Sequence, residues 1–441
     1  MALKRVLPLR TVVATSVGLA LASSSFVAAV QVASFVAGDA AWLAILVAGV
    51  LCTLAALCFA ELNGMLPSAA GLRLWLGRAF GPGVALTVSL LYMGVLTGIV
   101  GAESYVISHI MVAVLPFWSP AVWIVLMLAF VTLLNLRGVK LAGNFQDLVT
   151  YAVLCSLVVM AAAGLARGHG SLTTPLSPGS AQGFIRAVAV GIFLFVGFEW
   201  VAPLAEEVTE VRHISRGMLV AVGILGVTYA LFTVAMTSLV PKGVLATSAT
   251  PQVLFAGRAF GAAGVVWMAV LSLAASLKTF NAGLISVSRF MYATAREHAL
   301  PSVFARLSYR YFTPWVAILT LFVVAVALSL GVLWTGRYLV LVNMAAAVES
   351  VVYALVGLSV IALRRKEPNL ARPFFVPGGM IVPLVTVVVF GVLAAAVLAT
   401  DRRALLYLVL GLLLAAAYVR LIVPRLRERA RRARLARRRQ A

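Results

Sequence analysis

The sequence predicts an all-α integral membrane protein with twelve transmembrane helices. Of its 441 residues, 63% are apolar and only 11% are charged, whereas an ordinary soluble domain is about 45–50% apolar. The apolar residues fall into long runs, and a helix of about 20 residues is long enough to cross the hydrocarbon layer of a bilayer. The basic residues gather between these runs. This composition excludes a large soluble catalytic domain.

The first apolar run, residues 11–36, follows three basic residues within residues 1–10. It is longer than the apolar core of about 7–15 residues in a signal peptide. We therefore expect residues 1–10 to be a cytoplasmic N-terminus and the run to be an uncleaved first span. Eleven further spans are expected at residues 41–62, 84–115, 119–136, 145–166, 183–204, 216–240, 263–293, 315–335, 337–363, 378–400 and 404–423.

The distribution of basic residues orients these spans. With the N-terminus in the cytoplasm, the inside segments hold 27 of the 35 lysines and arginines, and the outside segments hold seven. Because basic residues are retained on the cytoplasmic side, we expect a multi-pass protein of the cell (inner) membrane with both termini cytoplasmic. The net charge of +22 is thus mainly a topology signal.

The C-terminal tail, residues 424–441, carries nine arginines and one glutamate. Such a segment binds anionic lipid headgroups or RNA through its charge. The tail has no interleaved aromatic residues and no nucleic-acid-binding fold beside it. We expect it to contact anionic lipid, with a specific partner as the alternative and no nucleic acid.

Four ionisable residues stand out within the predicted spans: Glu103, Glu199, Lys278 and Glu349. A charge at the centre of a bilayer costs at least about 2.5–3.5 kcal/mol, so such residues face a partner or a cavity. Two interpretations stay open. Lys278 and Glu349 form a structural ion pair that fixes helix packing, or these residues form an ion-coupling site.

Helical periodicity separates these charges from two stripes of small residues. At about 100° per residue, Lys278 and Glu103 each lie about 120° away from the stripe on their own span. Small stripes are close-packing surfaces between membrane helices, so we expect both charged residues to face a shared water-filled path instead. The stripes consist of Ser272, Ser276, Thr279, Gly283 and Ser286, and of Gly94, Thr97, Gly98, Gly101, Ser104 and Ser108.

Two spans contain residues that interrupt a helix. The first span has Ala22-Ser23-Ser24-Ser25 at its middle, and the sixth has Val196-Gly197-Phe198-Glu199 followed by Pro203. Interrupted spans at corresponding positions of two halves indicate a transporter's binding site, because freed backbone groups there hold ions and solute. The alternative is a serine-rich packing face together with a proline kink.

Five segments of the chain resemble the amino acid–polyamine–organocation (APC) superfamily, in particular the bacterial amino-acid permeases. The resemblance extends over almost the whole chain, and the segments stand in the order that the family has. They are "AELNGMLPSAAGLRLWLGRAFG" (60–81), "NLRGVKLAGNFQDLVT" (135–150), "GFEWVAPLAEEV" (197–208), "SRFMYATAREHALPSVFARLSYRYFTP" (288–314) and "RRKEPNLARPFFVPG" (364–378).

The resemblance implies a LeuT-like inverted repeat of five plus five spans, residues 11–166 and 183–363, with broken helices 1 and 6. Residues 378–423 would form two peripheral spans. Solute would lie between the breaks, with its carboxylate on the amides of the first break and its amine on carbonyls of the second. The residues implied are Ala22, Ser23, Ser24 and Ser25 in the first span and Phe193, Leu194, Val196 and Gly197 in the sixth, with Phe193 as an aromatic gate.

The chain departs from the family pattern in two places. Serines stand where the first break is normally glycine-rich, and residues 151–156 of the fifth span lack the lysine that proton-coupled relatives often carry. We hypothesise that Lys278 supplies this cation from the eighth span, where sodium-dependent relatives bind a metal ion. Glu103 and Glu199 are further candidates for proton sensing. The acidic residues at 206–210 are interpreted as a solvated run pairing with Arg212 or Arg216.

These observations predict a secondary transporter of amino acids or related amines that works by alternating access, coupled to protons and independent of sodium. The alternatives are an exchanger and a non-transporting solute sensor. The sequence contains no HExxH, GxSxG or phosphate-binding glycine motif, which are signatures of common enzyme classes. Cys52, Cys58 and Cys155 have no metal-ligand spacing. We therefore expect neither enzymatic activity nor a cofactor or bound metal.

Overall fold

The computed structural model describes residues 3–35, 40–168, 181–248 and 250–440. Within these ranges the chain is helical, apart from connecting segments and one isolated bridge between Leu7 and Val208. The elements are α1 (Leu9–Ala20), α2 (Ser23–Phe35), α3 (Ala41–Met65), α4 (Gly71–Phe80), α5 (Pro82–Val114), α6 (Pro120–Leu136), α7 (Val139–Arg167), α8 (Ala181–Phe193), η1 (Phe198–Glu206), α9 (Arg212–Leu239), α10 (Lys242–Thr247), α11 (Pro251–Arg296), η2 (Ser302–Ala305), α12 (Trp315–Thr335), α13 (Tyr338–Lys366), α14 (Ile381–Thr400), α15 (Arg402–Leu421) and α16 (Val423–Gln440).

The described helices account for a multi-pass membrane protein. Ten of them are long and apolar enough to cross a membrane, and α1 with α2 make an eleventh span if the bent pair is counted as one. The predicted fourth span coincides with α6, an apolar helix of 17 residues, which is at the short end of what crosses a bilayer. The count of twelve therefore stays a prediction.

The first span is broken, as its polar centre predicts. α1 ends at Ala20 and α2 begins at Ser23, and the two helices meet at an angle of 61°. The interruption falls at Leu21 and Ala22, so the three serines form the first turn of α2. An unbroken helix with a serine-rich packing face is therefore the wrong interpretation.

The sixth span is interrupted as well. α8 ends at Phe193, and the chain resumes at Phe198 as a 3-10 helix, η1, that contains Pro203. Gly197 adopts a φ of +111°, and a Cβ atom there would lie 2.9 Å from Leu19 Cδ2 in the first span. A glycine at position 197 therefore allows both the positive φ angle and the close approach of the two breaks.

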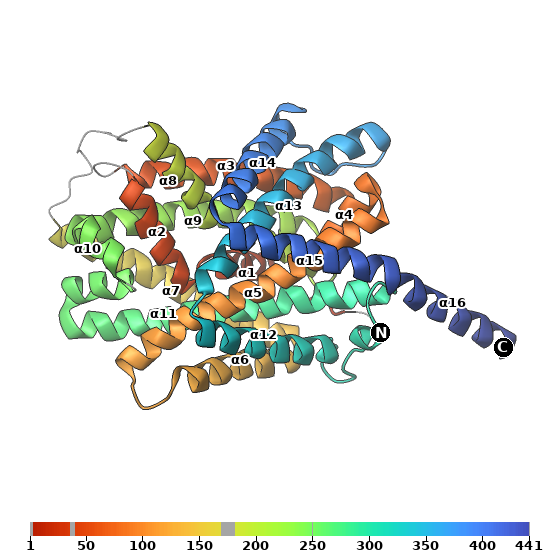
Figure 1. The fold of residues 1–441 in the computed structure, drawn as a ribbon, viewed down its shortest axis with the longest axis horizontal. Helices are drawn as coiled ribbons and strands as arrows, with labels where there is room; N and C mark the ends of the chain where they lie inside the picture. Colours follow the sequence, from red (N-terminus) through yellow and green to blue (C-terminus); the bar gives the residue numbers. More distant parts are fainter. Residues whose placement is uncertain (1–2, 36–39, 169–180, 249, 441) are drawn as a thin grey trace.

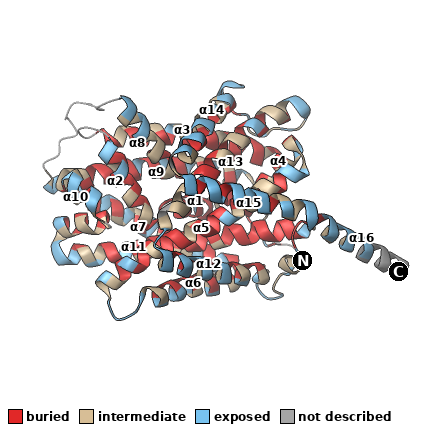
Figure 2. Cartoon of the chain, viewed as in Figure 1, coloured by how far each residue is buried: buried red, intermediate tan, exposed pale blue. Residues whose placement is uncertain are grey.

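α1 lies in the middle of the bundle (Figure 1), and every residue from Thr11 to Ala20 is buried. It contacts α7, α9, α11 and η1. Among the long apolar helices, α14 and α15 are the least buried, which agrees with the two peripheral spans expected for residues 378–423. Figure 2 shows exposed residues along α16, and both ends of the chain lie at the same end of the bundle in Figure 1.

Candidate functional site at the two helix breaks

The ammonium group of Lys278 caps the broken end of α1. Lys278 Nζ lies 3.2 Å from the carbonyl oxygen of Gly18 and also donates to the carbonyl oxygen of Leu21. Thr279 Oγ1 donates to the same Gly18 oxygen at 2.8 Å. The side chain of Lys278 is completely buried. Because the C-terminus of a helix carries partial negative charge, the cation stabilises the end of α1.

The carboxylate of Glu103 caps the N-terminal end of α2. Ser23 N donates to Glu103 Oε1 at 2.9 Å, and Ser24 N donates to Glu103 Oε2 at 3.1 Å. Ser276 Oγ from α11 donates to Glu103 Oε1 at 2.5 Å. Glu103 is 1% exposed. The partial positive charge at the N-terminus of α2 is therefore met by a carboxylate of this chain.

The other backbone groups of the first break and the hydroxyl of Ser25 also bond within the protein. Ala22 N donates to Ser25 Oγ at 3.3 Å and Ser25 N donates to the Ala22 carbonyl at 3.2 Å. The carbonyl of Ala20 accepts from Tyr229 OH at 2.9 Å and from Ser25 Oγ at 3.0 Å. All four amides from residue 22 to residue 25 therefore have an acceptor inside the protein.

The second break differs from the first because some of its backbone carbonyl oxygens accept no hydrogen bond within the described part of the chain. The carbonyl of Phe193 accepts from Val196 N at 3.2 Å, and that of Phe198 accepts from Ser16 Oγ of α1 at 2.8 Å. The carbonyl oxygens of Leu194 and Val196 accept no hydrogen bond from any described residue. Val196 is partly exposed, whereas Leu194 is buried. The break in the sixth span thus retains two backbone acceptors without a described partner, next to Phe193 in the cavity wall.

Glu199, just after the second break, is buried among hydrogen-bond donors. Tyr92 OH donates to Glu199 Oε1 at 2.5 Å, and Tyr353 OH donates to Glu199 Oε2 at 2.6 Å. Gly197 N lies 3.3 Å from the same Oε2. Both carboxyl oxygens of Glu199 are thus hydrogen-bonded within the protein.

Glu349 on α13 lies near the same aromatic side chains, since the ring of Trp200 stacks on that of Tyr92 with the ring centroids 4.1 Å apart. Trp200 Nε1 donates to Glu349 Oε1 at 3.4 Å, while Glu349 Oε2 has no hydrogen-bond partner among the described residues. The second break is therefore flanked by two buried carboxyl groups, of which Glu349 alone has an unpaired oxygen among the described residues.

The structure separates the four ionisable residues into two groups. Lys278 and Glu103 lie at the first break, and Glu199 and Glu349 lie at the second. The structural ion pair between Lys278 and Glu349 is therefore wrong, because each residue bonds to other groups. The stripe on α11 packs against the first span, where Ser23 Oγ donates to the Ser272 carbonyl at 2.8 Å.

The expectation of a shared water-filled path for Lys278 and Glu103 is also wrong. Both side chains are buried and bond to the backbone of the first break. The angle of a residue on its own span does not show which groups of other spans it reaches. Glu103 accepts a hydrogen bond from Ser276, which belongs to the small stripe on α11. The first span bends between α5 and α11 and offers both charges a helix end.

A cavity of about 540 Å³ leads from the outside of the bundle toward the breaks. Its wall is formed by α2, α5, α8, α13 and α14. Ser24 and Phe193 lie at its inner part, next to the breaks, and Gln31, Phe35 and Arg186 are exposed lining residues toward its mouth. Of the residues predicted to bind solute, Ser24 and Phe193 line this cavity.

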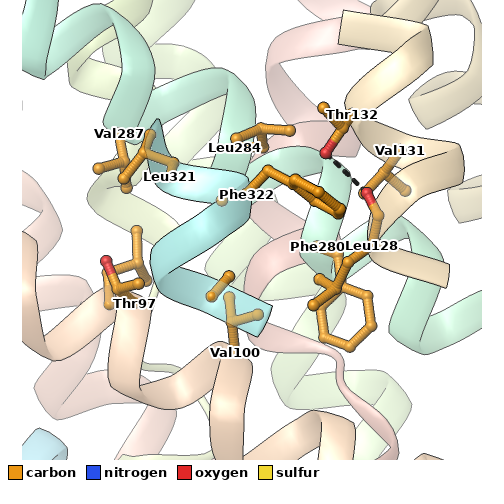
Figure 3. Close-up of a pocket in the computed structure, with 13 residues that line it drawn as sticks. Thr97, Val100, Leu128, Val131, Thr132, Phe280, Leu284, Val287, Leu321 and Phe322 are labelled. Atoms are coloured by element: carbon orange, nitrogen blue, oxygen red, sulfur yellow. Dashed lines mark hydrogen bonds between the residues drawn. The ribbon is translucent and has the colours of Figure 1, made fainter. Parts of the chain in front are cut away.

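A second cavity, shown in Figure 3, is an apolar gap between α5, α6, α11 and α12 with a volume of about 40 Å³. Its two hydroxyl groups are already used within their helices. Thr132 Oγ1 donates to the Leu128 carbonyl at 2.7 Å, and Thr97 Oγ1 donates to the Met93 carbonyl at 3.0 Å. This gap therefore lacks groups that would recognise a polar solute.

Ion pairs join several segments at the end of the bundle where the N-terminus of the chain lies. Arg289 Nε on α11 donates to Glu207 Oε2 at 2.8 Å, and both side chains are buried. Arg296 pairs with Glu206 at 2.6 Å. The backbone of Leu7 bonds to that of Glu207 at 3.0 Å. The end opposite the large cavity is therefore closed around residues 206–208.

The interpretation of residues 206–210 as a solvated run is correct for one residue of three. Glu210 is half-exposed and bonds to Arg212, and this guanidinium holds the pKa of the Glu210 carboxyl below its ordinary value. Glu206 and Glu207 instead pair with Arg296 and Arg289, about 80–90 residues away in sequence. Local sequence contains no signal for these remote partners.

A buried ion pair between α3 and α13 was not predicted. Arg364 contacts both carboxylate oxygens of Glu61, at 2.9 and 2.5 Å, and Val376 N donates to Glu61 Oε2 at 2.8 Å. Glu61 is buried. Its position at the end of an apolar run made it a candidate for pairing, but its partner lies 303 residues away.

The arrangement of broken helices, buried charges and an adjoining cavity is typical of membrane transporters. The sequence profile of the amino acid permease family matches residues 7–415. The methylthioribose transporter of Bacillus subtilis (strain 168) is 24% identical over 393 residues, which cover 84% of this chain and 83% of that protein. The vacuolar cationic amino acid transporter 4 of Arabidopsis thaliana is 27% identical over 347 residues, covering 72% and 57%.

The branched-chain amino acid permease BcaP of B. subtilis is 26% identical over 273 residues, covering 60% of this chain and 56% of that protein. The chain thus spans less than two thirds of some of these relatives. Because the family profile covers nearly the whole sequence, the chain belongs to the amino acid permease family of the APC superfamily. Its relatives are named as transporters and permeases, not as enzymes.

Proposed function

We propose that this protein is a secondary transporter that moves an amino acid or a related amine by alternating access. The observation that carries the proposal is the meeting of two broken spans next to a cavity of about 540 Å³. Broken helices expose backbone groups and helix ends that bind small charged solutes at mid-membrane. Ser24 and Phe193, one from each broken span, line this cavity and would contact the solute.

The packing of the helices supports alternating access. α1, α2, α3, α8, η1 and α9 contact one another as a group, which would move as one bundle against the remaining helices. In the present arrangement the cavity adjoins one side of the breaks, and the Arg289–Glu207 pair closes the other side. Transport requires this pair to separate when the cavity side closes.

Lys278 is proposed to make transport independent of sodium. Its ammonium group bonds to the carbonyl oxygens of Gly18 and Leu21, and carbonyl oxygens are the groups by which unwound transporter helices coordinate sodium. A resident cation at these oxygens leaves them unavailable to a metal ion. No carboxylate lies within 4.0 Å of Lys278 Nζ among the described residues, so the backbone is its principal partner.

The Glu199–Glu349 pair is the proposed carrier of the coupled proton. Glu199 already accepts three hydrogen bonds, while Glu349 has one free oxygen. We therefore propose that the coupled proton binds to the unpaired oxygen of Glu349. Glu199 and Glu349 both lie near the second break. A movement of η1 would therefore change the distance between their carboxyl groups and, with it, how strongly they bind the proton.

The test uses the purified protein in liposomes. Vesicles preloaded with unlabelled amino acids or amines are diluted into labelled solute, with and without sodium and with an imposed pH gradient. We expect labelled solute to accumulate without sodium and to respond to the pH gradient. Binding without such counterflow would identify a sensor, and counterflow that ignores the pH gradient would identify an exchanger.

Variants of Lys278 test its proposed role separately from the other parts of the proposal. Lys278→Met is expected to abolish sodium-independent transport or to remove its pH dependence, because the two carbonyl oxygens then lack a cation. Lys278→Arg, which keeps the positive charge, serves as the matched control. A strict sodium requirement of the wild type, or full activity of Lys278→Met with an unchanged pH profile, would contradict this role.

A further inference from the structure

We infer that Glu103 is a specificity-determining residue: its side chain takes the place of a solute carboxylate at the N-terminus of α2, so the transported solute is an amine that lacks a carboxylate. This inference rests on the proposed function and narrows its substrate class. The observation behind it is the pair of hydrogen bonds from Ser23 N and Ser24 N to the two oxygens of Glu103, at 2.9 and 3.1 Å.

The first step concerns hydrogen-bond donors. A carboxylate entering the site needs donors, and the natural ones are the amides from residue 22 to residue 25. Each of these amides already has an acceptor within the protein, as described above. Ser23 Oγ is also occupied, because it donates to the Ser272 carbonyl at 2.8 Å. The first break therefore has no free backbone donor to offer.

The second step concerns charge. The N-terminus of a helix carries about half a positive elementary charge, and Glu103 places a full negative charge against it in a buried position. The ammonium of Lys278 lies at the opposite side of the break, on the carbonyls of Gly18 and Leu21. A second carboxylate at α2 would meet the like charge of Glu103 instead of an uncompensated helix end.

The third step concerns what the site does offer. The carbonyl oxygens of Leu194 and Val196 in the second break accept no hydrogen bond from the described residues. These groups are acceptors, and an ammonium group is a strong donor without acceptor capacity. The free backbone groups of the two breaks are therefore acceptors, which match the amine end of a solute, and the hydroxyl of Ser24 in the cavity wall can donate or accept.

Arg186 is the charged residue among those lining the cavity, and it requires a separate account. It is exposed and lies seven residues before Phe193 on α8, which is about 10 Å along a helix. Its guanidinium thus belongs to the mouth of the cavity. It does not replace the occupied amides at the break.

The experiment compares amines with the amino acids from which they differ by a carboxylate alone. Suitable pairs are cadaverine and lysine, putrescine and ornithine, agmatine and arginine, and ethanolamine and serine. Each compound is tested by thermal stabilisation of the purified protein, since a ligand that binds the folded state raises its apparent stability, and by counterflow in liposomes. We expect the wild type to prefer the amine of at least one pair by tenfold or more.

Glu103→Ala vacates the two amides and is expected to reduce this preference by at least tenfold, with new transport of the matching amino acid. Glu103→Gln keeps the size of the side chain and removes its charge, so it covers the case in which Glu103→Ala does not fold. Glu428→Gln, an exposed carboxylate on α16, is the matched control and should leave the preference unchanged.

The outcomes distinguish the two levels of the proposal. If the wild type transports an amino acid as well as its decarboxylated partner in every pair that it recognises, the inference about Glu103 is overturned while the transporter function stands. An amine preference that persists unchanged in both Glu103 variants also overturns it. Absence of counterflow for every compound contradicts the proposed function itself.

Discussion

Two buried charged residues in this protein are stabilised by helix ends instead of by an ion pair. Lys278 bonds to carbonyls at the end of α1, and Glu103 bonds to amides at the start of α2. Such contacts compensate a buried charge without a second ion. Arg289 and Glu207 show the other solution, a buried pair of opposite charges between α11 and the residue that follows η1.

The Arg289–Glu207 pair provides a stability test. Removing one partner of a buried ion pair leaves the other charge unpaired and costs about 3–5 kcal/mol. We therefore expect Arg289→Met and Glu207→Leu each to lower the apparent melting temperature of the purified protein strongly, and the double variant to recover most of the loss. A thermal double-mutant cycle measures this coupling.

The Arg296–Glu206 pair is the control for this cycle, because it joins the same two segments but is partly exposed. Exposed ion pairs contribute about 0–1 kcal/mol, so Arg296→Met should have little effect. Equal losses for Arg289→Met and Arg296→Met would show that burial of the Arg289–Glu207 pair has no energetic consequence.

At the residue scale, the sequence identified the exceptional charged residues but did not identify the groups to which they bond. Glu103, Glu199, Lys278 and Glu349 were recognised as exceptional because a charge within an apolar run is costly wherever the run folds. Their partners lie on other helices, for example Ser23, which is 80 residues from Glu103. The pairing of Lys278 with Glu349 failed because opposite charge on two spans does not establish that the spans meet.

At the scale of elements, the helix breaks could be predicted and their exact form could not. Serines and the Gly197–Pro203 segment weaken a helix locally, so the interruptions were expected near residues 22–25 and 196–203. The first break falls at Leu21 and Ala22 instead, since the serines start α2. The residues on either side of it are then fixed by contacts from α5, α9 and α11: Ser23 bonds to Glu103 and Ser272, and Ala20 bonds to Tyr229.

The start of α15 offers a test of an element end outside the spans. Asp401 Oδ1 accepts from Arg403 N at 2.9 Å and from Ala404 N at 3.1 Å, while Oδ2 accepts from Asn343 Nδ2 at 2.9 Å. Removing an N-cap side chain costs about 0.5–2 kcal/mol. We expect Asp401→Ala to lower thermal stability at pH 7 by this amount, while Asp401→Asn retains most of it.

The same residue predicts a pH dependence. The hydrogen bond from Asn343 and those from the backbone hold the pKa of the Asp401 carboxyl below its ordinary value. Stability from a lowered carboxyl pKa is present above the pKa of the unfolded chain, about 3.9, and is lost as the pH falls through the folded-state pKa. The difference between wild type and Asp401→Ala should therefore shrink in acid. A constant difference from pH 7 to pH 3 would contradict this assignment.

At the scale of the whole molecule, the structure has two unlike ends. One end contains the mouth of the cavity, with Arg186 among its lining residues. The other holds both ends of the chain and the ion pairs around residues 206–208 (Figure 1). Basic loops and tail predict that this second end faces the cytoplasm.

Cysteine labelling tests this orientation. Arg5, Arg186 and Glu428 are exposed, and each is replaced by cysteine in turn. A membrane-impermeant thiol reagent should label Arg186→Cys in intact cells, and Arg5→Cys and Glu428→Cys only in inverted vesicles. The wild type is the control for background labelling of Cys155, which is exposed on α7, whereas Cys52 and Cys58 are buried. Labelling of Arg5→Cys and Arg186→Cys from the same side would contradict the predicted topology.

The amino-acid sequence alone was sufficient for the class of protein, the approximate spans, the two interruptions and the buried ionisable residues. These features depend on the composition and periodicity of continuous segments, and lipid imposes the same requirement on each segment separately. The role of each charge required the folded molecule. Only the packing of α5 and α11 around the break of the first span places Glu103 on the amides of Ser23 and Ser24 and Lys278 on the carbonyl of Gly18, because such contacts join segments from 79 to 260 residues apart.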